Sequence, residues 1–156
     1  MPSPAKARDS MSKGRRIATC LELARDCAKD ARILLKAESR NAAYLASQAA
    51  EHLITAVATA EGIHIERKDA HQLDTIVRKI PEENPDRRAL AAITFLEAYA
   101  TSYRYGTPTG RVPATPSSDR VEDALAAIDG LIVSLEKHFA VEAEVGGTAS
   151  NPVPRR

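Results

Sequence analysis

Four residues that could bind a ligand recur at helical spacing within the segment 41–60. They are Tyr44, Gln48, Glu51 and Thr55, separated by steps of four, three and four residues. At about 100° per residue, their side chains lie within about 60° of one another on a helix. This polar stripe either faces water or forms a polar groove or dimer face. Few long charged side chains occur in the segment, which favours contact on more than one side. The opposite face carries only apolar side chains (Ala46, Ala50, Leu53 and Val57).

Two further segments contain candidates for contact with a ligand. Arg104 lies between Tyr103 and Tyr105 at the end of a predicted helix. Arginine pairs bidentately with phosphate, and tyrosine stacks on a nucleobase. Arg104 and Tyr105 are therefore candidates for nucleotide binding. The alternative is an aromatic anchor that docks the following loop; it is equally open for Arg104, and we favour it for Tyr103. His71 begins a short predicted helix, where it is either a structural residue or a ligand-binding one.

Standard motifs for metals, cofactors and catalysis are missing from the sequence. It contains no glycine-rich phosphate loop, no Ser/His/Asp arrangement and no cysteine–histidine set with zinc spacing. Glu61, His64, Glu66, Asp69 and His71 follow one another closely, but their spacing matches no standard ligand set. We expect no metal site and no cofactor, and we assign no catalytic residue.

Composition and cysteine spacing limit the class of protein. The formal net charge is only +1, unlike that of a dedicated nucleic-acid binder. Cys20 and Cys27 are seven residues apart, about 10.5 Å along a helix, which exceeds the reach of a disulfide. They are expected to be free thiols in a reducing compartment. Because no apolar run approaches the ~18 residues of a membrane span, we predict a cytoplasmic protein without a membrane partner.

Hydrophobic periodicity predicts five helices and no strands. A disordered basic leader (1–14) precedes a helical domain (15–142), and a disordered tail (143–156) follows it. The second helix occupies 41–60, with Ser39 or Asn41 as its cap and Gly62 just beyond its end. The others are a first helix ending near residue 38, a third at 71–79, a fourth running from Pro85 into Tyr105, and a last one from Ser118. The predicted fold is all-α, an up-and-down bundle of about five helices.

The polar stripe and two shorter motifs together resemble the HEPN domain family, over roughly residues 17–140. The run 44–51 is similar to the family's second-helix pattern of Tyr, then Gln, then Glu after small residues. The segment 71–73 resembles its His-x-Leu entry to the third helix, and 103–105 resembles the Arg-Tyr end of its fourth. The resemblance implies a helical bundle that is frequently a homodimer. It also implies work on nucleotides or RNA beside a nucleotidyltransferase, often in toxin–antitoxin or defence systems.

One family motif is missing from this chain. The ribonuclease branch has an arginine followed, after four to six residues, by a histidine; here Arg67 and His71 are separated by only three residues. The leading hypothesis is therefore a non-catalytic, dimeric nucleotide- or RNA-binding partner of a nucleotidyltransferase. Its candidate ligand-binding residues are Tyr44, Gln48, Glu51, His71, Arg104 and Tyr105. The alternatives are a divergent metal-independent ribonuclease toxin that uses His71 or Arg104, and a structural helical interaction module.

Overall fold

The computed structural model describes the backbone of residues 4–145 and the side chains of residues 12–139. Within these bounds the chain is all-helical, as predicted, and contains no strand. It has six α-helices and two short 3₁₀ turns: α1 (Pro4–Lys36), α2 (Asn41–Ala60), η1 (Arg67–Asp69), α3 (Leu73–Lys79), α4 (Arg87–Ile93), η2 (Thr94–Leu96), α5 (Glu97–Ala100) and α6 (Ser118–Val145).

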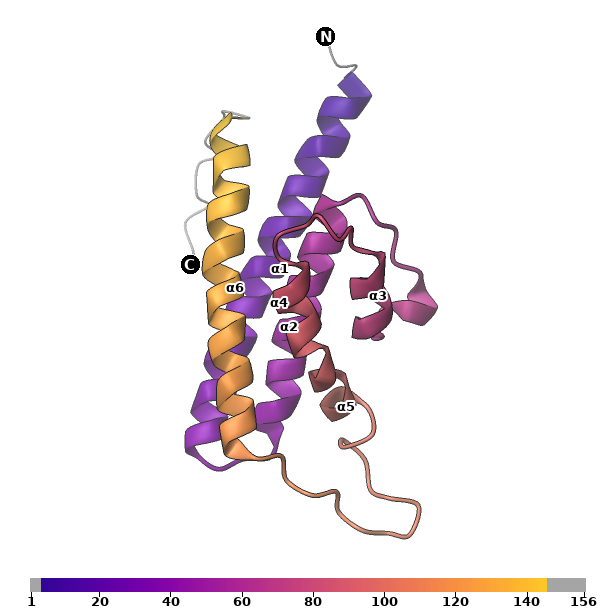
Figure 1. Ribbon diagram of the computed structural model, residues 1–156, viewed down its shortest axis with the longest axis vertical. Helices are drawn as coiled ribbons and strands as arrows, with labels where there is room; N and C mark the ends of the chain where they lie inside the picture. Colours follow the sequence, from indigo (N-terminus) through magenta and orange to yellow (C-terminus); the bar gives the residue numbers. More distant parts are fainter. Residues whose placement is uncertain (1–3, 146–156) are drawn as a thin grey trace, which may run out of the picture.

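Helix α2 lies at the centre of the bundle. It runs beside the long helices α1 and α6, and the short helices α3, α4 and α5 gather beside it (Figure 1). Helix α2 contacts each of these five helices, whereas the principal neighbours of α1 are only α2 and α6. Ion pairs between Arg25 and Glu136 and between Arg32 and Asp129 join α1 to α6. Helices α3 and α5 are therefore held to the molecule chiefly through α2, whereas α4 packs against both α2 and α6.

Alanine allows α2 to take this central position. Asn41 is the only exposed residue among its 20 positions. Small side chains let neighbouring helix axes approach closely, and alanine also has the best helix propensity. The expectation that this helix makes contacts on more than one side is confirmed. Seven of its alanines are buried (Ala42, Ala43, Ala46, Ala49, Ala50, Ala56 and Ala58).

The ends of α2 follow local signals in the sequence. At the start, the Ser39 hydroxyl accepts a hydrogen bond from the Asn41 backbone N–H at 3.2 Å. At the end, Gly62 has a φ of +73°, in the left-handed region that favours glycine. The backbone N–H of Ile63 then donates to the carbonyl of Ala58 at 2.9 Å, which closes the last turn. The predicted range of 41–60 is confirmed.

Helix α1 overlaps the segment for which the sequence predicts a leader. Helix α1 already begins at Pro4, within the segment 1–14 that the sequence predicts to be a disordered leader. Proline suits the first position of a helix, and the alanine, lysine, arginine and methionine residues that follow are strong helix formers. Extending a nucleated helix into such a segment costs little. At the other end α6 continues to Val145, and residues 146–156 of the predicted tail lie outside the described residues.

The predicted fourth helix is broken into shorter pieces. Helix α4 gives way to the 3₁₀ turn η2, and α5 ends at Ala100. The Thr94 hydroxyl donates to the carbonyl of Ala91 at 2.9 Å, a back-bond that commonly bends helices. Tyr103 and Arg104 therefore lie in a turn rather than in a helix. Glu97, the first residue of α5, accepts a hydrogen bond from the Leu73 N–H at 3.0 Å and so caps the start of α3.

None of the described helices is long and apolar enough to cross a membrane.

A larger side chain at Ala50 should disturb the packing around α2. Ala50 is fully buried. We predict that Ala50→Leu lowers the free energy of unfolding by about 1–3 kcal/mol, because the added atoms force neighbouring helices apart. Denaturant titration followed by circular dichroism measures the effect. Ala126→Leu, at an exposed position of α6, is the control and should change stability by less than about 0.5 kcal/mol. Equal stability of the Ala50→Leu variant and the wild type would contradict this packing.

The half-buried His52 should make the fold sensitive to acid. Burial lowers the pKa of its imidazole below the ordinary value, and the nearby Glu51 carboxylate only partly offsets this. The unfolded chain then binds the proton more readily, so His52 costs stability as the pH falls through about 6.5, its unfolded pKa. His52→Gln should therefore lose less stability than the wild type between about pH 7.5 and pH 5.5. Urea unfolding at both pH values tests this. His64→Gln, at an exposed histidine, should behave like the wild type, and an unchanged pH dependence in His52→Gln would refute the prediction.

Candidate functional site

Most of the aromatic residues of the protein gather at one end of the bundle. The chain has four tyrosines, two phenylalanines and no tryptophan. The rings of Phe95 and Tyr99 meet edge to face with their centroids 6.5 Å apart, and the centroids of Tyr99 and Tyr103 are 5.1 Å apart. Tyr44 and Tyr105 join this cluster through Arg104. All four tyrosines and one phenylalanine therefore belong to one surface region.

Arginine side chains lie over these rings. The guanidinium carbon of Arg104 is 4.5 Å from the centroid of the Tyr44 ring and 5.8 Å from that of Tyr105. The guanidinium carbon of Arg120 is 4.4 Å from the Phe95 centroid. Such cation–π contacts restrict the side chain while its N–H groups remain able to donate to an anion. The region therefore presents fixed positive charge beside exposed aromatic surface.

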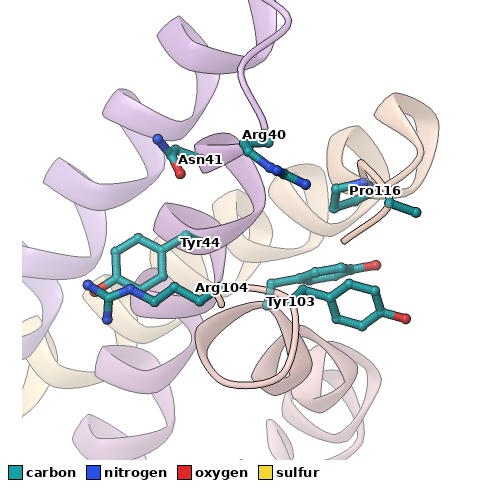
Figure 2. Close-up of a pocket in the computed structure, with 8 residues that line it drawn as sticks. Arg40, Asn41, Tyr44, Tyr103, Arg104 and Pro116 are labelled. Atoms are coloured by element: carbon teal, nitrogen blue, oxygen red, sulfur yellow. The ribbon is translucent and has the colours of Figure 1, made fainter. Parts of the chain in front are cut away.

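A shallow pocket opens in this region (Figure 2). Its volume is about 410 Å³, including the open space at its mouth. The residues of the lining include two arginines and three tyrosines but no carboxylate, so an anionic ligand would meet no repelling charge there. The lining consists of Arg40, Asn41, Tyr44, Tyr99, Tyr103, Arg104, Ala114 and Pro116.

Arg40 holds the loop between α5 and α6 against this pocket. It lies at the N-terminal end of α2 and extends toward Pro116 (Figure 2), with its guanidinium donating to the carbonyl of Pro113. That bond orients the side chain. The pocket also lies at the first turn of α2, because Asn41 and Tyr44 line it, and the positive end of a helix dipole favours anions. Both features make the electrostatic environment of the pocket more favourable to an anion than to a cation.

The polar stripe continues from this pocket along α2. Its four residues, Tyr44, Gln48, Glu51 and Thr55, are all half-buried. The stripe is therefore neither a fully solvent-exposed surface nor part of the core. At its far end Nδ1 of His71 lies 3.0 Å from Oε1 of Glu51, whose side chain is only 19% exposed. Tyr44 and Glu51 are seven residues apart, about 10 Å along the helix. The structure thus divides the six candidates into an arginine–tyrosine cluster and a glutamate–histidine pair, with Gln48 between them.

Sequence reasoning missed several residues of the pocket. Arg40, Asn41 and Pro116 come from loops and helix ends, where periodicity carries no information about contacts. Tyr99 could have been found, because Phe95, Tyr99 and Tyr103 follow one another at steps of four residues. Tyr103 fits both interpretations considered for it, since it packs against Tyr99 and also lines the pocket.

The two cysteines do not contribute a reactive thiol. Cys20 and Cys27 lie on α1, half-buried against the core. Burial raises the pKa of both thiols, and neighbouring carboxylates of Asp30 and Asp26 raise that of Cys27 further. Because the thiolate is the reactive form, both residues are poor nucleophiles at neutral pH.

The fold and the pocket define an all-helical domain with a cationic, aromatic site at one end of its bundle. The model of the HEPN domain family matches residues 17–138, and the chain belongs to this family. Comparison with curated proteins and with solved structures gave no match.

Proposed function

We propose that this protein is a non-catalytic, cytoplasmic HEPN domain that binds a nucleotide, free or within an RNA strand, in the pocket beside Tyr44. The observation that carries the proposal is the Arg104 guanidinium held 4.5 Å over the Tyr44 ring, in a pocket lined also by Arg40 and by no carboxylate. Membership of the HEPN family, in which nucleotide- and RNA-associated domains are expected, supports the same proposal.

The two chemical halves of a nucleotide have matching groups in this pocket. A nucleobase stacks on the ring of Tyr103, the exposed tyrosine of the lining, and such a stack contributes about 1–3 kcal/mol. The phosphate receives charge-assisted hydrogen bonds from Arg104 or Arg40, each contributing about 1.5–3 kcal/mol. Arg40 and Arg104 both line the pocket, one at the start of α2 and the other after α5. The Arg104 guanidinium lies over Tyr44 and that of Arg40 extends toward Pro116 (Figure 2), so the two arginines offer a phosphate alternative positions in the pocket.

The proposal includes a homodimer, with a nucleotidyltransferase as partner, acting in a toxin–antitoxin or defence system. Exposed apolar side chains on the two outer long helices support self-association. Leu23 and Ile33 on α1 and Val133 on α6 are 42%, 57% and 55% exposed. Gly130, also on α6, has open space where a side chain would stand. A second protein surface would cover such positions favourably.

Removing the Arg104 guanidinium should weaken nucleotide binding. We predict that Arg104→Ala raises the Kd for ATP, GTP or a short RNA by roughly 10- to 100-fold, because one charge-assisted contact and the support of the Tyr44 ring are lost. Isothermal titration calorimetry measures this. Arg88→Ala, at an exposed arginine of α4 outside the pocket, is the matched control and should bind like the wild type. Absence of binding by the wild type, or equal binding by Arg104→Ala, would refute the proposal.

RNA cleavage is a second candidate function, favoured by the Glu51–His71 pair. A carboxylate only accepts hydrogen bonds, so Nδ1 of His71 must be the donor, and in the neutral ring Nε2 is then the acceptor. A histidine oriented in this way is the usual arrangement of a general base. The imidazole is well placed to act on a ligand, since its side chain is 75% exposed.

Prolonged incubation with RNA tests this second candidate. If His71 acts as a base, the wild type should cleave a labelled RNA, and His71→Ala should lower the rate by about 100-fold or more. His64→Ala, at another exposed histidine of the connection between α2 and α3, should leave the rate unchanged. Intact RNA at high protein concentration would exclude cleavage while leaving the binding proposal standing.

A further inference from the structure

A second pocket adjoins the one beside Tyr44, on the other side of Arg40. Its volume is about 430 Å³, including the space at its mouth, and so matches the first. Arg40 and Pro116 line both pockets and form the wall between them. A ligand that fills one pocket and continues past Arg40 therefore enters the other.

The chemistry of the second pocket differs from that of the first. Arg40 is the only cation among its lining residues, and the acidic Glu38 lies at the same site. The aliphatic side chains of Leu35 and Val121 supply its apolar surface. The hydroxyl groups of Ser39, Thr115 and Ser118 can hydrogen-bond to a base edge or a sugar. This pocket suits an uncharged nucleoside and disfavours a terminal phosphate.

We propose that the two pockets together bind a single-stranded RNA through two consecutive nucleotides, with the linking phosphodiester on the Arg40 guanidinium. This inference rests on the proposed nucleotide-binding function of the first pocket. The shared wall is where the phosphate between two neighbouring nucleosides must pass, and Arg40 is the cation located there. The guanidinium has five N–H donors, so its bond to the Pro113 carbonyl leaves others for the phosphate. Glu38 supplies an acceptor for a ribose hydroxyl, which favours RNA over DNA.

A dinucleotide should consequently bind more tightly than a mononucleotide. In calorimetry or fluorescence anisotropy, we expect the diribonucleotide ApA to bind the 156-residue chain about tenfold more tightly than AMP, as a second nucleoside contact would provide. Thr115→Trp fills the second pocket from an exposed position, so it should reduce ApA affinity to the level of AMP without changing that of AMP. Thr109→Trp, at an exposed position of the same loop outside both pockets, is the matched control.

Two further measurements distinguish a specific loss of binding from a folding defect. Arg40→Gln should reduce the affinity for ApA at least tenfold, with the circular dichroism spectrum serving as the check on folding. Deoxyribose d(ApA) should bind several-fold more weakly than ApA, and equal binding would overturn the assignment to RNA. If AMP binds and depends on Arg104 while ApA binds no tighter, the inference fails and the proposed function stands. If neither AMP nor ApA binds, the proposed function fails, and the inference fails with it.

Discussion

The close packing of α2 against its neighbours on nearly every side is the constraint on which the other features of this domain depend. Its buried alanines let α1 and α6 approach from one side and the short helices from the other. The same helix starts beside Arg40 and positions Tyr44, Gln48 and Glu51. A shift of α2 would therefore alter the core and the candidate site together.

The composition of this core also explains where the aromatic residues lie. The buried hydrophobic residues of the described chain are alanine, leucine, isoleucine and valine, and none is aromatic. Bulky rings do not fit between closely spaced alanine faces. The tyrosines instead lie at the end of the bundle, where α5 and the following loop meet the start of α2. The use of small side chains in the core thus leaves tyrosine rings and arginine side chains at the surface around one pocket.

The sequence predicts the helices better than it predicts the site. Apolar spacing and Gly62 define α2 to the residue, because helix length depends on local signals. The fourth helix is broken by the 3₁₀ turn η2, where Thr94 also makes its back-bond, and apolar spacing alone does not signal such a change of helix type. The structure also pairs Glu51 with His71 and Arg104 with Tyr44, two contacts between distant segments that helical spacing alone does not give. Arg40, however, enters the site only because the loop carrying Pro113 returns across the end of α2, and no local pattern encodes that return.

The loop between α5 and α6 contributes to the pockets but not to the core. It provides Ala114, Thr115 and Pro116 to the pockets, yet none of residues 101–120 is buried in the core. Substitutions there change what a ligand meets at little cost to folding, whereas substitutions in α2 alter both. The lining of the two pockets can therefore be altered through this one loop while the bundle stays the same.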